Sequence, residues 1–135
     1  MPPDASKICH RAFSQVWLTT AALFRYFAIM RNSEGEVLLR TLKAVASPVR
    51  LEILTLLKDP VGNFPPQIDG DLVHDGVCAD FIRDKLGIAA ATASRHLTLL
   101  TDAGLLVATR KKNWTFYRRD PTAIERFIDS LTSDL

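Results

Sequence analysis

The spacing of apolar residues along the chain predicts mostly helices. Apolar side chains recur at intervals of three and four residues over 5–30, 36–46 and 122–131, which places them on one stripe of each helix. Asn32 to Gly35 break the first two segments apart. We expect the apolar face of the helix 36–46 to consist of Val37, Leu38, Thr41, Leu42 and Val45.

A further helix is expected to begin at Pro48. Ser47 before it is a good N-cap, and proline is tolerated at the first helical position. Asp59-Pro60 ends this helix, whose apolar residues are Val49, Leu51, Ile53, Leu54, Leu56 and Leu57.

Residues 60–76 hold three prolines and three glycines, which predicts a long loop. A short helix, Val77 to Leu86, is expected next, and Gly87 stands where a left-handed C-cap is favoured. A three-residue turn leads to another helix, Ala90 to Ala103, which Gly104 closes. The sequence thus predicts two helices joined by a tight turn.

After Gly104 the pattern changes to that of strands. Leu105–Thr109 and Trp114–Arg118 are β-prone runs, separated by the basic stretch Arg110-Lys111-Lys112-Asn113. They predict a hairpin with a basic tip. Helix, tight turn, helix and hairpin in this order predict a mainly α fold with a small β-hairpin, a winged helix-turn-helix.

The charge distribution favours a polyanionic partner. The chain of 135 residues has a formal net charge of only +2, with 47% hydrophobic and 24% charged residues, as in an ordinary globular domain. Residues 83–119 nevertheless hold eight bases and two acids, a net +6, whereas residues 59–80 hold five acids and no base. One basic segment in a nearly neutral chain is typical of binding DNA through one face.

The second helix of the pair is expected to read DNA. Ala93, Leu97 and Leu100 fall on its buried side, so its polar positions face outward. The planar guanidinium of Arg95 can bond a guanine through two hydrogen bonds, and the hairpin cations suit phosphate oxygens. The predicted DNA-binding residues are Ala90, Ala91, Thr92, Ser94, Arg95, Thr98, Arg110, Lys111 and Lys112.

Other functions have less support in the sequence. A solvated charged hairpin beside an ordinary amphipathic helix would explain each element alone, but not all of them in this order. A winged helix that binds only proteins has no need of three adjacent wing cations. No phosphate-binding glycine loop, nucleophile elbow or HExxH motif is present, so we do not expect an enzyme, and we expect no cofactor.

Three separated stretches resemble the arsenical-resistance-repressor (ArsR) family of transcriptional regulators. Leu42–Leu54 resembles the family's opening signature, Thr92–Leu106 its recognition helix, and Trp114–Arg118 its wing. The resemblance covers about residues 38–119. It implies a homodimer built from terminal helices, which binds double-stranded DNA at an imperfect palindrome and represses transcription until an effector releases it.

The resemblance also implies a domain organisation. Residues 1–35 would be an N-terminal helix and dimerisation arm, residues 36–120 the DNA-binding domain, and residues 121–135 a C-terminal dimerisation helix. One departure concerns the start of the recognition helix, where the family often has a serine N-cap and a Gln-Pro pair. Here Ala89, Ala90 and Ala91 stand instead, so the base preference should differ.

Metal- or thiol-based sensing is the alternative that the family brings. Its members often place thiolates at the start of the helix before the recognition helix, where this chain has Cys78. Cys9, His10, Cys78 and Asp80 together would be chemically acceptable for zinc. A buried structural cysteine explains Cys78 more simply, and a Cys9–Cys78 redox pair lacks a base that would lower either thiol pKa.

Two further assignments follow from composition. His74 lies among Asp69, Asp71 and Asp75, which could hold a cation but more often form a solvated loop. The most apolar stretch, Val16–Met30, is interrupted by Arg25 and is short for a membrane span. With two widely separated cysteines, the chain is therefore expected in the cytoplasm, with no membrane contact.

Overall fold

The computed structural model describes residues 20–25, 28 and 34–135 of the chain. These residues fall into two compact units, Met1–Glu36 and Val37–Leu135. In the first unit residues 20–25 and 28 are helical, and the side chains of Leu23 and Phe24 are exposed. The rest of the helix expected over 5–30 lies outside the described residues.

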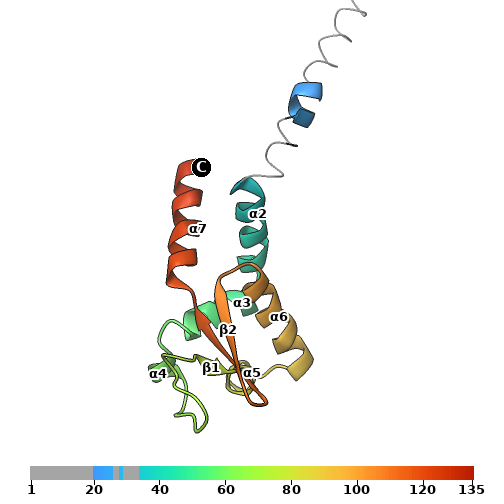
Figure 1. Ribbon diagram of the computed structural model, residues 1–135. Coiled ribbons are helices and arrows are strands. Elements are labelled where there is room, and N and C mark those ends of the chain that lie inside the picture. Colours follow the sequence, from blue (N-terminus) through green and yellow to red (C-terminus); the bar gives the residue numbers. More distant parts are fainter. Residues whose placement is uncertain (1–19, 26–27, 29–33) are drawn as a thin grey trace, which may run out of the picture. The chain divides into compact units, whose positions relative to one another are not determined.

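The second unit is mainly helical with one small sheet, as the sequence predicts (Figure 1). Its helices are α2 (Glu34–Val45, which begins in the first unit), α3 (Pro48–Leu56), α4 (Pro60–Asn63), α5 (Ala79–Leu86), α6 (Ala90–Asp102) and α7 (Pro121–Asp134). The strands are β1 (Val77–Cys78), β2 (Leu106–Lys111) and β3 (Trp114–Arg119). Residues 37–45 of α2 and helix α7 extend toward one end of this unit, and the hairpin tip lies at the other.

Local capping explains where several helices begin and end. Ser47 caps α3 through its side chain, which accepts a hydrogen bond from the backbone N–H of Arg50, and Pro48 is the first helical residue. Asp120 caps α7 in the same way. Gly87 ends α5 in the left-handed conformation that glycine adopts without strain.

The sheet has one strand more than the sequence predicts. All three strands are antiparallel in the order β1-β3-β2, with Val77 opposite Tyr117 and Cys78 opposite Phe116. The expectation that Val77 and Cys78 begin a helix is therefore wrong. Two residues are too few to show the alternation that identifies a strand in a sequence. They form β1 because their backbone pairs with the edge of β3 that β2 leaves free.

The loop expected over 60–76 is partly structured. Asp59 caps the four-residue helix α4 through its carboxylate, which accepts from the N–H of Gly62. Phe64 is buried after it, so the rest of the segment starts from a fixed point. A second correction concerns the hairpin, whose strands include Arg110 and Lys111, so that its turn consists of only Lys112 and Asn113.

The core gathers side chains from α2, α3, α5, α6 and the sheet. Ile53, Ile82, Leu97, Leu100 and Phe116 are among its largest fully buried members. On α2, Thr41 is buried as expected, but Ala44 is also buried whereas Val37 and Leu42 are exposed, contrary to expectation. Leu51 of α3 is likewise exposed.

No helix in the described part of the chain is long and apolar enough to cross a membrane.

Candidate nucleic-acid interface

Helices α5 and α6 form the helix-turn-helix pair. The left-handed Gly87 reverses the chain after α5, and α6 starts three residues later at Ala90. Ala89 stands at the N-cap of α6 and makes no side-chain capping hydrogen bond. The first turn of α6 therefore presents backbone N–H groups that its own cap leaves unbonded, where they can meet a phosphate.

Helix α6 has one buried and one exposed side. Ala93, Leu97 and Leu100 are buried against the core, and the helix contacts α3, α5 and β2. The positions that the sequence assigns to DNA contact are all exposed: Ala90, Ala91, Thr92, Ser94, Arg95 and Thr98. The structure thus presents these six residues on the free surface of a helix whose opposite side is fixed in the core.

Arg50 ties this helix to the rest of the domain. Its guanidinium donates to the backbone carbonyls of Lys43 and Ala44 at the end of α2, and its Nη1 lies 3.0 Å from Nδ1 of His96 on α6. Burial, together with the positive charges of Arg50 and Arg95, lowers the pKa of His96. A neutral imidazole can accept the hydrogen bond from Arg50, so one side chain joins three helices.

Nothing in the sequence pattern around Arg50 indicates this role, although Arg50 lies within the stretch that resembles the family signature. We expect Arg50→Ala to lower the free energy of unfolding by about 2 kcal/mol, because hydrogen bonds from a charged group are lost. Urea denaturation followed by circular dichroism measures this. Arg50→Lys should not restore the loss, since an ammonium cannot reproduce the planar fork.

Arg40→Ala is the matched control, because Arg40 is an exposed arginine on α2. It should change the free energy of unfolding by no more than about 0.5 kcal/mol. Equal effects of the Arg40 and Arg50 variants would contradict the role given to Arg50.

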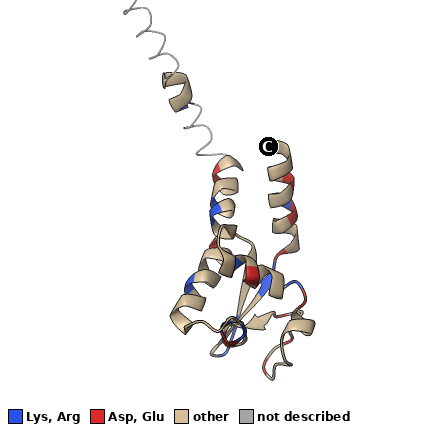
Figure 2. Ribbon diagram, turned by 180° about the vertical axis from the view of Figure 1, so that it is seen from behind, with Lys and Arg blue, Asp and Glu red and all other residues tan. Residues whose placement is uncertain are grey.

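The hairpin β2–β3 places its cations near its tip. Arg110 and Lys111 end β2, and Lys112 occupies the turn with a positive φ of 54°. All three side chains are exposed. Figure 2 shows the basic and acidic residues of this unit from the side opposite to that of Figure 1.

Two of these cations make ion pairs that the sequence pattern does not predict. The ammonium of Lys111 lies 2.8 Å from the carboxylate of Asp75, and that of Lys112 lies 3.9 Å from the carboxylate of Asp69. The hydrogen bond from Lys111 is the main cause of a lowered pKa of Asp75. The acidic loop and the basic wing are therefore neighbours.

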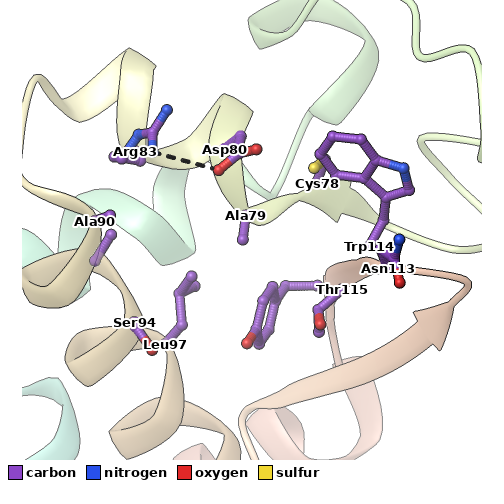
Figure 3. Close-up of a pocket in the computed structure, with 12 residues that line it drawn as sticks. Cys78, Ala79, Asp80, Arg83, Ala90, Ser94, Leu97, Asn113, Trp114 and Thr115 are labelled. Atoms are coloured by element: carbon purple, nitrogen blue, oxygen red, sulfur yellow. Dashed lines mark ion pairs between the residues drawn. The ribbon is translucent and has the colours of Figure 1, made fainter.

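A cleft of about 260 Å³ lies between the helix pair and the hairpin (Figure 3). Ala90 and Ser94 of α6 line it, and Asn113 and Trp114 of the hairpin lie across from them. The exposed side of α6 and the hairpin tip are thus two separate surfaces on either side of this cleft.

Part of the predicted metal set can be placed. Cys78 is buried, and Asp80 forms an ion pair with Arg83 at 3.5 Å. Cys9 and His10 lie outside the described residues, so metal or thiol sensing stays a hypothesis. In the loop, Asp71 accepts from the N–H groups of Val73 and His74, and no group of three or more His, Cys, Asp or Glu able to hold a metal occurs among the described residues.

Comparison with known proteins supports the same reading. No protein-family model matches the chain. The chain is 41% identical over 93 residues to YbzH, an uncharacterised HTH-type transcriptional regulator of Bacillus subtilis strain 168. The match covers 69% of this chain and 93% of that protein.

Two solved structures have a similar fold. One is the homodimeric winged helix-turn-helix DNA-binding domain of Mb0332 from Mycobacterium bovis, a possible ArsR-family transcriptional regulator. It is 25% identical with a TM-score of 0.51, over 73% of this chain and 80% of that one. The other is an ArsR-like transcriptional regulator from Rhodococcus sp. RHA1, 19% identical with a TM-score of 0.54, over 73% of this chain and 78% of that one.

Proposed function

The chain belongs to the HTH-type transcriptional regulators with the winged helix-turn-helix fold of the ArsR type, and from this premise we propose how it contacts DNA. Helix α6 enters the major groove with Thr92, Ser94 and Arg95 toward base edges. Ala90 and Ala91 approach thymine methyl groups, and Thr98 lies toward the backbone. Arg110, Lys111 and Lys112 of the wing bind phosphates beside the groove.

The observation that carries this proposal is the division of α6 into two sides. Ala93, Leu97 and Leu100 are each 2% exposed or less, whereas all six assigned contact residues are exposed. A helix held so firmly by its inner side can present its outer side in one orientation, and sequence recognition requires that.

We further propose that the regulator acts as a homodimer that represses transcription until an effector releases it. Residues 121–135 and helix α2 supply the dimer surface in this proposal. Support comes from apolar side chains that the second unit leaves exposed on these helices, namely Val37, Leu39, Leu42 and Ile128. Two recognition helices related by a two-fold axis would read an imperfect palindrome.

The wing is tested by replacing its two lysines. Lys111→Ala with Lys112→Ala should weaken binding to duplex DNA from the protein's own promoter region and to unrelated duplex by similar factors, because phosphates carry no sequence information. The slope of log affinity against log salt should become shallower by up to about two. Fluorescence anisotropy at several salt concentrations measures both quantities.

Lys58→Ala, which removes an exposed lysine outside the proposed DNA-contacting and dimer surfaces, is the control for lost charge. If the wing variant and this control bind DNA equally well at low salt, the wing does not contact phosphates and that part of the proposal is wrong.

A further inference from the structure

The segment 64–76, named here the acidic strap, is a built element and not a loose loop. The side chain of Gln67, near the start of the strap, bonds to the backbone at the end of the strap and at β1. Its Oε1 accepts from the backbone N–H of Cys78 at 2.6 Å, and its Nε2 donates to the carbonyl of Gly76 at 2.9 Å. Gly70 lies so close to the ring of Phe116 that a Cβ would be 2.8 Å from it. The strap is therefore fixed against β1 and β3.

The acidic end of the strap is ordered by its own backbone. The carboxylate of Asp71 accepts from the N–H groups of Val73 at 2.9 Å and His74 at 2.7 Å, which closes a tight turn. One oxygen of Asp75 accepts from the N–H of Asp71 at 2.9 Å. The Asp75 side chain is only 17% exposed, so its carboxylate is held in one place.

From this position the strap reaches the two wing lysines. The second carboxylate oxygen of Asp75 lies 2.8 Å from Nζ of Lys111, and a carboxylate oxygen of Asp69 lies 3.9 Å from Nζ of Lys112. Arg110, the third wing cation, makes no ion pair with any residue that the structure describes. The strap thus neutralises the two cations at the very tip of the wing.

We propose that the acidic strap is an intramolecular competitor of DNA, which occupies Lys111 and Lys112 through Asp75 and Asp69 until a phosphate displaces it. This inference rests on the phosphate contacts proposed for the wing. A lysine ammonium that binds a phosphate can no longer pair fully with a carboxylate, so DNA binding weakens or breaks the two ion pairs. It also brings the carboxylates of the strap close to the phosphates, which repel them. The cost falls on every DNA sequence alike.

A cost common to all sequences leaves the ratio of specific to unspecific affinity unchanged, but it lowers both affinities. Unspecific affinity comes almost wholly from phosphate contacts, whereas a specific site adds base contacts through α6. A strap that weakens the phosphate contacts therefore lowers the occupancy of unrelated DNA, whereas a site with additional base contacts can stay occupied at the same protein concentration. Its effect should be greatest at low salt, where electrostatic contacts are strongest.

The experiment uses the full chain with Asp69→Asn and Asp75→Asn together, on an unrelated duplex at low salt. Asparagine keeps the oxygen that accepts from Asp71 but removes the charge. We expect binding to tighten about three- to tenfold, since both lysines are exposed and ion pairs near the surface are individually weak. We also expect the dependence of affinity on salt to become steeper.

Glu52→Gln with Asp102→Asn is the control, because it removes two exposed charges that face no wing lysine in the structure. The proposal is overturned if the strap variant binds no more tightly than this control. It is also overturned if the strap variant binds more weakly than the wild type, which would show that the aspartates position the lysines for DNA. Asp69→Asn alone, tested in parallel, leaves the strap turn untouched.

A variant that combines the strap and wing substitutions separates this inference from the proposed function. When Lys111→Ala and Lys112→Ala are added to the strap variant, its gain in affinity should disappear. If the lysine variant alone binds like the wild type, the wing contact itself fails. If that variant is weakened but the strap variant is unchanged, the wing contact stands and only the competition fails.

Discussion

Arg95→Ala is expected to lower the affinity for the protein's operator about ten- to hundredfold, while unrelated duplex loses much less. Arg95 is exposed in the N-terminal half of α6, the part that meets base edges in a major groove. A guanidinium that bonds a guanine through two hydrogen bonds contributes about 1–3 kcal/mol to discrimination between bases. An operator selected by the wild type from random duplexes, compared with a scrambled duplex by anisotropy, measures both losses.

Lys58→Ala is the control for the loss of one positive charge, because Lys58 is exposed at the end of α3. It should reduce affinity for both duplexes slightly and equally. If Arg95→Ala has the same small effect on operator and scrambled duplex, then Arg95 contacts only phosphates or nothing, and the assignment of specificity to it fails.

Gly76→Ala is expected to destabilise the domain by about 3 kcal/mol. Gly76 has a φ of 104°, a region that residues with a Cβ occupy at a cost of about 1–3 kcal/mol. A Cβ at this position would also clash with the backbone carbonyl of Tyr117, which belongs to β3. Accommodating it requires β1 and the acidic strap to move away from β3. Urea denaturation measures the loss.

Gly104→Ala separates the two causes. Gly104 has a similar φ of 82°, but a Cβ there meets nothing within 4 Å. It should cost only the conformational part, about 1–2 kcal/mol. Equal losses for the two variants would mean that the close approach of Gly76 to β3 contributes nothing.

The helix pair and the hairpin could be predicted from the sequence because local signals determine them. Ser47-Pro48 marks the start of α3, Gly87 ends α5, and the apolar period of α6 gives the correct buried residues, Ala93, Leu97 and Leu100. The predicted contact residues of α6 are exposed for the same reason, since the period that buries one side frees the other. Their contacts with DNA stay predictions.

The buried face of α2 could not be predicted in the same way. Apolar residues occur around much of this helix. Thr41 is buried as the sequence predicts, but only packing decides that Ala44 is buried while Val37 and Leu42 are exposed. If α2 takes part in the proposed dimer, the exposed residues would be covered by a second copy. The sequence of one chain does not distinguish a core face from such an interface.

The contact between strap and wing was missed because it is non-local. Asp75 and Lys111 are 36 positions apart in the sequence, and nothing near either residue indicates the other. They meet because β1 pairs with β3 and carries the strap toward the hairpin. The opposite charges of residues 59–80 and 83–119 were visible in the sequence, but their pairing required the third strand.

The claim that α6 reads bases through Arg95 is tested most directly by changing one atom of the DNA. In the selected operator, each guanine is replaced in turn by 7-deazaguanine, which lacks the N7 acceptor, and binding is measured for the wild type and for Arg95→Ala. We expect that replacing one guanine in each half-site weakens binding of the wild type and has no effect on binding of Arg95→Ala. If every replacement affects both proteins equally, Arg95 does not read a base.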